Sequence, residues 1–561
     1  MTPPATPSPW PLRALLLLAL VLFGCGIWWG LPGRWGWAGD ELHPSSWGQA
    51  ISWQAPANHH EWHLRYPPLH FAVLQGTSFP LRWLIDHGVL FAGDKTGVAG
   101  LTALIYFGRF ISLLMALGTL IVLYRVGREI YDHRSALFTV LITMCIAPYV
   151  YYAKMGNLDV PYVLWFAFSL LFYVRILKQH RLRDYLLFAA AAAAAVCTKD
   201  QAYGLYALAP LPILYSLYRR DYRRDFAERG AVRGLARALV DKRMLLAAVT
   251  AALLFGVFGE VLFNPQRFAV HVKLLRGPMS ESYQDYEDTA EGHQMLLSLF
   301  VKQVAFVLDP LLALVCVAGV GVTVWRAIRR KADQEDLLLG CVFFLLVSYY
   351  VTFLNLILFS YDRYLLPVAV ILAFFGGRAL GLLTRPGVRW LRLRQAAVAA
   401  GFVYALLYAA SVDARLLADS RYHVEEWIAK NAPPPVSVAA VGRKKHIPRF
   451  PWIPWERVLR TKTRILQWQR PQFLTVTVSD LRHPEEIRIY HQLATGELGY
   501  RLVLLYEGHP LFDLLNVDGV GSSQRFINPE MAVFQRLDSG PPGAGVPSGA
   551  LPVAHSPHGG V

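Results

Sequence analysis

The chain has 561 residues, 55% of them hydrophobic, and a mean hydropathy of +0.34. A soluble enzyme of this length rarely contains so many long apolar runs, so this composition indicates a multi-pass membrane protein. The formal net charge of +16 does not indicate nucleic-acid binding, because the basic residues gather in short connections between the apolar segments. All five cysteines fall within apolar segments, which argues against a disulfide framework or a cysteine metal site.

Eleven apolar segments have, or come close to, the length that crosses a hydrocarbon core of ~30 Å. In chain order they span residues 14–31, 101–124, 136–153, 161–177, 185–197, 202–218, 244–263, 305–325, 337–359, 365–383 and 396–412. The segment 185–197 is short for a full crossing, and 69–85 forms either a further span or an amphipathic segment at the interface. We therefore expect 11 to 13 transmembrane helices.

The positive charges are distributed unevenly between the two sets of connections. If the N-terminus lies in the cytoplasm, 25 Lys and Arg residues fall on short cytoplasmic segments, and the opposite connections are much poorer in them. This is the positive-inside pattern, which fixes the orientation of membrane proteins. We therefore expect a multi-pass protein of the cell inner (plasma) membrane, with a long first extracytoplasmic loop at residues 32–100.

The composition changes from Asp413 onward. Residues 422–430 carry apolar side chains at helical spacing, and the pattern stops at the Pro-rich stretch after Asn431. Short apolar runs of strand length follow at 436–441, 473–478 and 502–506. The sequence thus predicts a transmembrane domain (1–412), a small extracytoplasmic α/β C-terminal domain (413–537) and a disordered tail (538–561).

Five short motifs place charged residues near the predicted outer ends of the spans. They are Gly39-Asp40-Glu41, Tyr66-Pro67-Pro68-Leu69, Asn157-Leu158-Asp159, Thr198-Lys199-Asp200 and Asp362-Arg363-Tyr364. Charges this close to hydrocarbon are costly, and they commonly mark a functional site or a water-filled cavity. Because these motifs, together with Lys154, lie at one predicted membrane face, we expect them to converge on a single site.

This ordered set of motifs resembles the polyprenyl-phosphate-sugar-dependent glycosyltransferases of the GT-C fold, in particular the protein O-mannosyltransferase and lipid A aminoarabinose transferase group. The resemblance covers about residues 14–383. It implies a polytopic α-helical protein that moves a sugar from a polyprenyl-phosphate donor to an acceptor hydroxyl at the extracytoplasmic face. The implied partners are the polyprenyl-phosphate sugar, membrane lipid and an acceptor glycan, lipid or protein.

Such a reaction needs cations that hold the phosphate as negative charge builds on it, and a carboxylate that takes the proton of the acceptor hydroxyl. The resemblance assigns the catalytic base to Asp40, with Glu41 beside it as the second catalytic carboxylate. It assigns contact with the donor phosphate to Arg363, whose planar fork suits a phosphodiester. Lys199 and Arg65 are further candidates for binding the donor phosphate.

Four other residues are expected to contact the sugar or acceptor, or to support the site: Asp159, Tyr66, Asp200 and His43. The resemblance implies that Asp159 orients a sugar hydroxyl or a cation in the cavity. Tyr66 is a departure, because many relatives have Lys or His before the Pro-Pro-Leu sequence. Tyrosine supplies no positive charge, so either Arg65 substitutes or the phosphate is held by the other cations.

A metal site has weaker support than this assignment. Residues 59–63 are His-His-Glu-Trp-His, but Glu61 lies two places after His59, where a zinc-binding HExxH motif needs it one place after. No metal site is predicted. The resemblance implies no required cofactor beyond the lipid-linked sugar, although a divalent cation is compatible with it.

Two other functions fit the same spans. One is an oligosaccharide ligase with a diphosphate-linked lipid donor, and the other is a transporter or flippase for a lipid-linked sugar. Transporters commonly place ionisable residues at the membrane midplane, on discontinuous helices with paired repeats. Here the charges lie at one face and no repeat of fixed period is present, which favours the enzyme. The sequence identifies neither the sugar nor the acceptor.

Overall fold

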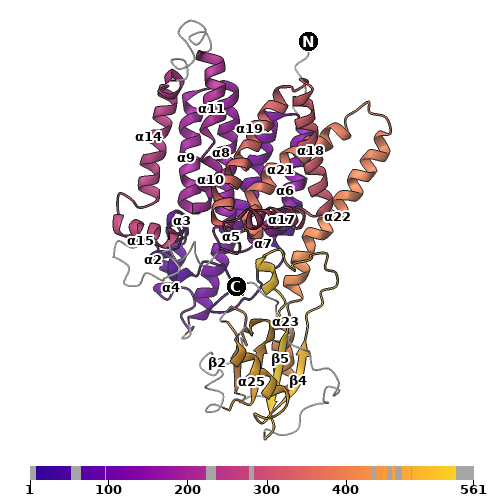
Figure 1. The fold of residues 1–561 in the computed structure, drawn as a ribbon. Coiled ribbons are helices and arrows are strands. Elements are labelled where there is room, and N and C mark those ends of the chain that lie inside the picture. The colour runs from indigo at the N-terminus through magenta and orange to yellow at the C-terminus, as the bar shows by residue number, and fades with distance from the viewer. Residues whose placement is uncertain are drawn as a thin grey trace.

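The computed structural model describes residues 8–51, 65–94, 97–222, 236–276, 284–432, 437–443, 445–450, 458–460, 470–481 and 483–538. A bundle of long helices is followed by a small sheet domain, and the two lie at opposite ends of the molecule (Figure 1). Two sequence predictions lie outside the described residues. They concern the histidines at 59–63 and all but the first residue of the tail 538–561.

The helices of the N-terminal half follow the apolar segments of the sequence. They are α1 (Trp10–Gly24), α2 (Pro44–Gln49), α3 (Leu69–Thr77), α4 (Phe79–Asp86), α5 (Val98–Ile130), α6 (His133–Met144), α7 (Ala147–Ala153), α8 (Asp159–Gln179), α9 (Leu182–Thr198), η2 (Asp200–Ala202), α10 (Tyr203–Tyr206), α11 (Pro210–Leu217) and η3 (Tyr218–Tyr222). The segment 69–85 is therefore two short helices, α3 and α4, and does not form a single span.

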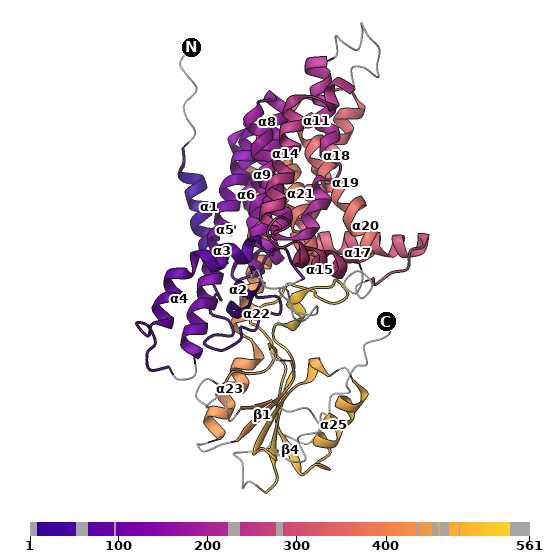
Figure 2. The same ribbon diagram turned by 90° about the vertical axis from the view of Figure 1, so that its left-hand side faces the viewer.

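The second half of the bundle contains α14 (Lys242–Phe258), α15 (Pro265–Arg276), α17 (Ala290–Leu308), α18 (Pro310–Ile328), α19 (Gln334–Tyr349), η4 (Tyr350–Leu354), α20 (Asn355–Ile357), η5 (Asp362–Leu365), α21 (Leu366–Leu383) and α22 (Leu391–Leu417). Most of the long helices run side by side. Helices α15 and α17 lie across them, at the end of the bundle that faces the sheet domain (Figures 1 and 2).

Among the described residues, six helices are long and apolar enough to cross a membrane, and α6 with α7 makes a seventh if this pair, bent by 71°, is one span. This number is lower than the 11 to 13 predicted. Several predicted spans form helices of 15 to 17 residues, namely α1, α9 and α14. A helix of that length covers less than a ~30 Å hydrocarbon core at about 1.5 Å per residue.

Apolar side chains on the outside of the bundle agree with a membrane environment. Leu314 on α18 and Val403 on α22 are 65% and 59% exposed, and each has apolar exposed neighbours on the same helix. A water-soluble protein rarely exposes such surface over several helices. The predicted fold class, a multi-pass α-helical membrane protein with a small α/β C-terminal region, is confirmed.

The predicted span 305–325 is wrong in its boundaries, because the chain breaks at Asp309. Helix α17 ends at Leu308 and α18 begins at Pro310. The Asp309 carboxylate accepts hydrogen bonds from the backbone N–H groups of Leu311 (2.8 Å) and Leu312 (2.9 Å). An N-terminal Asp followed by Pro is a strong helix-start signal, and here it starts α18 after the crosswise helix α17.

The C-terminal domain contains α23 (Ser420–Asn431), β1 (Val438–Val441), β2 (Val458–Arg460), β3 (Phe473–Thr477), η8 (Val478–Asp480), α25 (Pro484–Ala494), β4 (Tyr500–Tyr506), η9 (Ser523–Phe526) and β5 (Met531–Arg536). The strand order is β2-β1-β3-β5-β4, with β1 parallel to β2 and β3, and β5 antiparallel to β3 and β4. The predicted helix and the three predicted strands are all present, and each differs from its predicted range by one or two residues at one end or at both.

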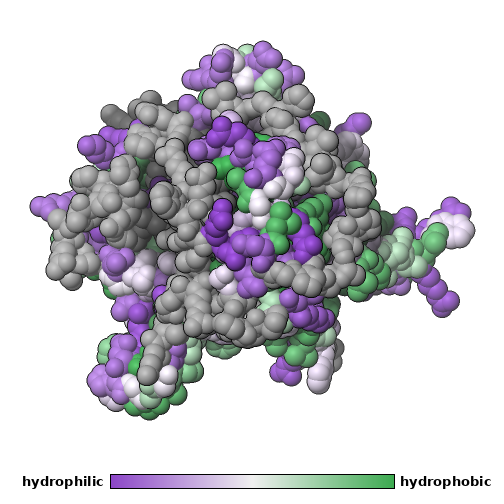
Figure 3. All heavy atoms as spheres, turned by 90° about the horizontal axis from the view of Figure 1, so that it is seen from below, coloured by the Kyte–Doolittle hydropathy of each residue, from purple (hydrophilic) through white to green (hydrophobic). Residues whose placement is uncertain are grey.

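One helix packs on each face of this sheet. Val424 and Ile428 of α23 contact Phe473 and its neighbours on one face, and Tyr490 and Leu493 of α25 pack on the other. The domain lies beyond the helix ends that carry the Asp40 loop, whereas α1 begins nearer the opposite end (Figure 2). Seen from the sheet domain, hydrophilic residues are spread among apolar ones over the described surface (Figure 3).

Candidate active site

A cavity of about 970 Å³ lies between the helix ends that face the sheet domain and the C-terminal domain itself. Six residues singled out from the sequence line it, and they come from four separate parts of the chain: Asp40, Arg65, Tyr66, Lys199, Asp200 and Arg363. The C-terminal domain contributes a second group: Arg443, Lys445, His446, Ser523, Arg525 and Phe526. The predicted convergence of the charged motifs on one site is therefore present in the fold.

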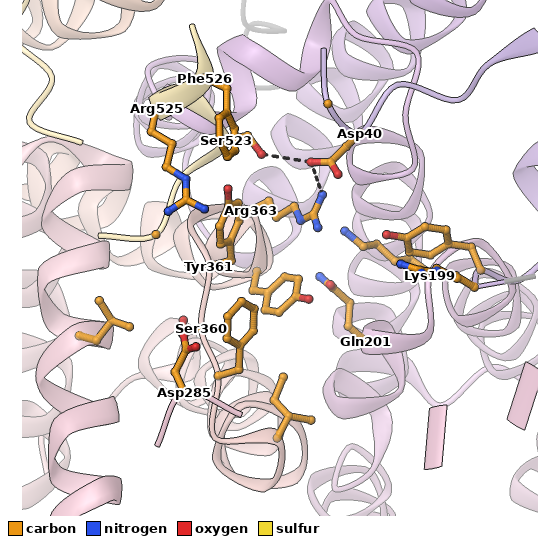
Figure 4. A pocket seen from close by; sticks show the side chains of 18 of the residues that line it. Asp40, Lys199, Gln201, Asp285, Ser360, Tyr361, Arg363, Ser523, Arg525 and Phe526 are labelled. Atoms are coloured by element: carbon orange, nitrogen blue, oxygen red, sulfur yellow. Dashed lines mark hydrogen bonds and ion pairs between the residues drawn. The ribbon is translucent and has the colours of Figure 1, made fainter. Parts of the chain in front are cut away.

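Asp40 and Arg363 form the centre of the cavity wall (Figure 4). Arg363 Nη1 lies 2.5 Å from Asp40 Oδ2, and their side chains are 15% and 25% exposed. The same oxygen of Asp40 accepts a hydrogen bond from Ser523 Oγ at 3.1 Å. The Arg363 guanidinium also lies over the rings of Tyr361 (5.3 Å) and Tyr364 (5.8 Å), which fixes its plane.

Glu41 has a different position from Asp40. Its carboxylate forms a bidentate pair with Arg109 of α5, with Nε–Oε1 at 2.6 Å and Nη2–Oε2 at 2.8 Å, and it accepts a hydrogen bond from the Gly156 N–H. It is buried and is not among the residues that line the cavity. In this position Glu41 stabilises the conformation of the loop. The position does not support the catalytic role expected for Glu41.

The chain before Asp40 is shaped around this buried pair. A Cβ atom at Gly36 would lie 2.0 Å from Glu41 Oε2 and 2.7 Å from Arg109 Nη2, so only glycine fits there. Arg109 Nη1 also donates to the backbone oxygens of Ile27 (2.6 Å) and Trp29 (2.9 Å). The long helix α5 thus holds the segment between Ile27 and Glu41, which presents Asp40 to the cavity.

Lys199 reaches the cavity from the end of α9. Its Nζ forms a buried ion pair with Asp159, the first residue of α8, and lies over the rings of Tyr162 (5.5 Å) and Tyr364 (5.7 Å). Asn157 Nδ2 donates to the other Asp159 oxygen at 3.0 Å. Asp159 therefore lies one layer behind the lining, where it orients Lys199.

The other predicted residues divide into two groups. Asp200 lines the cavity and pairs with His271 Nε2 of α15 at 3.0 Å, and Arg65 and Tyr66 line it from the segment before α3. His43 is placed elsewhere. It caps α2, where its ring nitrogens contact Ser45 Oγ (2.6 Å) and the Arg34 backbone oxygen (3.0 Å). Its position does not support a role at the acceptor.

Lys154, grouped with the site by sequence, is also placed elsewhere. It is buried, forms an ion pair with Asp413 of α22, and donates to the backbone oxygen of Leu22 at 2.9 Å. This pair joins α7, α22 and α1 and does not line the cavity.

Sequence reasoning missed the contribution of the C-terminal domain. Lys445 follows β1 in a basic run, and Ser523 and Arg525 lie in the connection between β4 and β5. No local sequence signal connected these residues with the first loop. Gln201 and Tyr361 were also missed, although each adjoins a motif that was identified.

Burial and charge set the ionisation of the groups outside the spans. Burial raises the pKa of Asp40, but the Arg363 charge and hydrogen bond outweigh it, so the pKa lies below its usual value. Burial lowers the pKa of Lys199 to about 8, against the opposing charge of Asp159. Burial raises the pKa of Tyr66, which keeps its phenol neutral. At neutral pH the Asp40 carboxylate is therefore anionic, and it lies beside at least two cations of the cavity wall.

The described residues contain no group of three or more His, Cys, Asp or Glu side chains placed to hold a metal ion. The cavity wall contains cations, phenols and the carboxylates of Asp40, Asp200 and Asp285. This set can neutralise a phosphate and accept a proton nearby, which are the two tasks of group transfer from a phosphate ester.

Part of the chain matches a known family. Residues 103–241, about a quarter of the sequence, match the model of the dolichyl-phosphate-mannose-protein mannosyltransferase family. The matched stretch includes Asp159, Lys199 and Asp200, and it confirms the resemblance to the protein O-mannosyltransferase group over that stretch. No curated protein matches the sequence.

Solved structures with a similar course of the chain include ArnT from Cupriavidus metallidurans. Its apo form has 16% identity over 93% of this chain and 97% of that chain, with a TM-score of 0.46. Its complex with undecaprenyl phosphate has 15% identity over 94% and 98%, with a TM-score of 0.47. The archaeal oligosaccharyltransferase AglB from Archaeoglobus fulgidus, with an inhibitory peptide and a dolichol-phosphate, has 11% identity over 83% and 69%, with a TM-score of 0.43. Scores below 0.5 give no basis for transferring a ligand from these proteins.

Proposed function

We propose that the protein is an integral-membrane glycosyltransferase of the GT-C type. In this proposal it moves a sugar from a polyprenyl-phosphate donor to an acceptor hydroxyl at the extracytoplasmic face of the plasma membrane. The observation that carries the proposal is the meeting of Asp40, Arg363 and Lys199 at one cavity, at the ends of membrane-spanning helices. The family match over 103–241 supports it independently.

The donor phosphate would lie between the cations of the cavity wall. Arg363 offers a planar fork, Lys199 a point charge, and Arg65 lies on the same lining. The reacting phosphate and anomeric carbon would then be near Asp40. A lipid-linked donor reaches such a site from the membrane, and the acceptor enters from the water side, where the C-terminal domain forms the other wall.

The transfer step follows from this arrangement. The acceptor oxygen attacks the anomeric carbon of the sugar, and its proton passes to the Asp40 carboxylate. The bond between that carbon and the phosphate oxygen breaks, and its electron pair leaves with the polyprenyl phosphate. Arg363 and Lys199 stabilise the negative charge that develops on the leaving phosphate. No cofactor besides the lipid-linked sugar takes part in this step, and a divalent cation would add only to the neutralisation of the phosphate.

The experiment that tests the proposal compares transfer with transport. The purified protein in liposomes would receive a radiolabelled polyprenyl-phosphate sugar together with a cell-envelope extract as acceptor. We expect label to leave the lipid and appear in acceptor. Movement of the intact labelled lipid across the bilayer, without transfer, would show a flippase, and transfer only from a diphosphate-linked donor would show a ligase.

The side of the membrane needs its own measurement. Cysteines introduced at Ser479, exposed on the C-terminal domain, and at Lys331, exposed at the opposite end of the bundle, would be tested in a cysteine-free background. We expect an impermeant thiol reagent added outside spheroplasts to label Ser479→Cys at once and Lys331→Cys only after permeabilisation. The reverse pattern would put the cavity on the cytoplasmic side.

A further inference from the structure

The C-terminal domain holds the segment that carries Asp40 at two points. Lys445 Nζ donates to the backbone oxygens of Gly39 (2.8 Å) and Glu41 (3.1 Å), the residues on either side of Asp40. Ser523 Oγ donates to the Asp40 carboxylate itself (3.1 Å) and accepts a hydrogen bond from Tyr152 (2.9 Å). The Lys445 contacts thus fix the backbone on both sides of Asp40, and the Ser523 contact, drawn in Figure 4, fixes its side chain.

The segment that carries Ser523 is anchored next to Arg363. The Asp362 N–H donates to the Gly521 backbone oxygen at 2.9 Å, and Ser522 Oγ donates to the Asp362 carboxylate. Gln303 of α17 donates to the Val520 backbone oxygen at 2.6 Å. Gly521 has a φ of +62°, a left-handed conformation that favours glycine, so the turn places Ser523 over the cavity at little conformational cost.

The third contact of Asp40, with Arg363, is the one that a bound donor would disturb. Arg363 is the best-placed guanidinium for the donor phosphate, and its Nε is buried with no hydrogen-bond partner among the described residues. A phosphate at Arg363 competes with Asp40 for the same cation. As the attraction between Arg363 and Asp40 weakens, the carboxylate becomes free to accept a proton, but it also loses the side-chain contact supplied by the helical bundle.

We propose that Lys445 and Ser523 are positioning residues that keep the Asp40 carboxylate directed toward the acceptor once Arg363 engages the donor phosphate. This inference rests on the proposed function. It makes the C-terminal domain part of the catalytic arrangement, because the base is presented by the membrane domain but kept in place by the domain beyond it. Donor binding should depend on the bundle alone, and the transfer step should depend on both parts.

The test measures donor binding and the transfer step separately, in the full-length protein. Lys445→Met and Ser523→Ala should each lower kcat by about tenfold to a hundredfold, the scale on which small misplacements of a reacting group act. The Kd for undecaprenyl phosphate, used as the donor-site probe, should stay within about twofold of the unaltered protein. Lys430→Met is the matched control, because Lys430 is exposed on the same domain and pairs only with Glu426 in the described structure. It should change neither quantity.

A pH profile distinguishes positioning from general stabilisation of the fold. The charged groups that face Asp40 are Arg363, Lys445 and Lys199, and the nearby phenols are those of Tyr66, Tyr151 and Tyr152. The positive charge of Lys445 lowers the pKa of Asp40. Lys445→Met should therefore move the acidic limb of the kcat profile to higher pH, and Lys445→Arg should restore its position. A residue that only stabilises the domain would not shift this limb.

The outcomes also separate this inference from the proposed function. If Asp40→Asn abolishes transfer while Lys445→Met and Ser523→Ala keep full kcat, the positioning role is overturned and the proposed function stands. If Asp40→Asn transfers normally, the base assignment itself fails. If the two variants raise the Kd for undecaprenyl phosphate as much as they lower kcat, they act on the whole site and the positioning role is also overturned.

Discussion

Asp40 and Glu41 are neighbours in the chain, and each pairs with an arginine, but they lie in two different regions. Asp40 faces the cavity, shares one oxygen with Arg363 and Ser523, and is a quarter exposed. Glu41 lies in a buried layer, where Arg109 takes both of its oxygens. A partly exposed carboxylate whose partners share a single oxygen can take part in chemistry, whereas a buried carboxylate with both oxygens paired has a structural role. The difference shows that burial and pairing geometry, and not charge alone, distinguish a carboxylate that can react from one that stabilises the fold.

The largest effect should come from the cavity region. Asp40→Asn keeps the size of the side chain and removes its capacity to take a proton, so transfer should fall by about 10²–10⁴-fold. Binding of undecaprenyl phosphate should persist, because the cations remain. Single-turnover transfer rates and donor titration would check both points. Near-normal turnover in the Asn variant would contradict the assignment of Asp40 as the reacting carboxylate and of Glu41 as a structural one.

A smaller effect is expected at the cation that pairs with Asp40. Arg363→Lys keeps the charge but loses the two-pronged contact with phosphate, so donor Kd should rise by about tenfold, the equivalent of roughly 1.4 kcal/mol. Titration with undecaprenyl phosphate measures this change, and Arg326→Lys at the opposite end of the bundle is the control. Unchanged Kd and unchanged rate would make Arg363 a structural residue like Arg109.

The cavity region should also respond to pH. The pKa of Lys199 is lowered by burial to about 8, so its cation is present below pH 8 and is lost as the pH rises through that value. The donor kcat/KM should therefore decline above pH 8, by at most about tenfold per pH unit for one group. Lys199→Arg, which stays charged, should remove this alkaline decline. An identical decline in both proteins would assign it to another group.

The smallest effect on transfer is expected in the buried layer. Glu41→Gln leaves Arg109 as a buried, incompletely paired charge, which should cost about 3–5 kcal/mol of stability. Turnover per folded molecule should change little, because Glu41 does not line the cavity. Thermal unfolding and active-site titration would separate the two quantities. Full stability together with lost turnover would move Glu41 back to the catalytic group.

The sequence predicted the cavity lining better than it predicted the contacts behind it. The ends of apolar spans can be located from hydropathy, so Asp40, Lys199 and Arg363 could be placed at one membrane face from the sequence alone. Which of two adjacent acidic residues faces the cavity could not be predicted, because the direction of each side chain depends on Arg109 and Gly36, which act through contacts made by folding.

The C-terminal half shows where local patterns are sufficient. Helix α23 and strands β1, β3 and β4 follow from apolar spacing and from the breaks between the runs. The contacts of Lys445 and Ser523 with the Asp40 segment join residues that are more than 400 positions apart, and no local pattern encodes them. The helix break at Asp309 is a different case, because its Asp-Pro signal was present in the sequence and the continuous apolar run obscured it.

The joint between the two parts of the molecule has a consequence for protein engineering. Helix α22 ends at Leu417 and α23 begins at Ser420. Asp419 in this joint is buried, pairs with Arg421 at 2.6 Å, and accepts a hydrogen bond from Trp29 Nε1 at 3.1 Å. The connection between α22 and α23 is therefore short, and its Asp419 is hydrogen-bonded to Trp29 of the first loop. The C-terminal domain therefore cannot be exchanged by itself. A chimera that takes this domain from a relative would also have to take the loop around Trp29 from that relative.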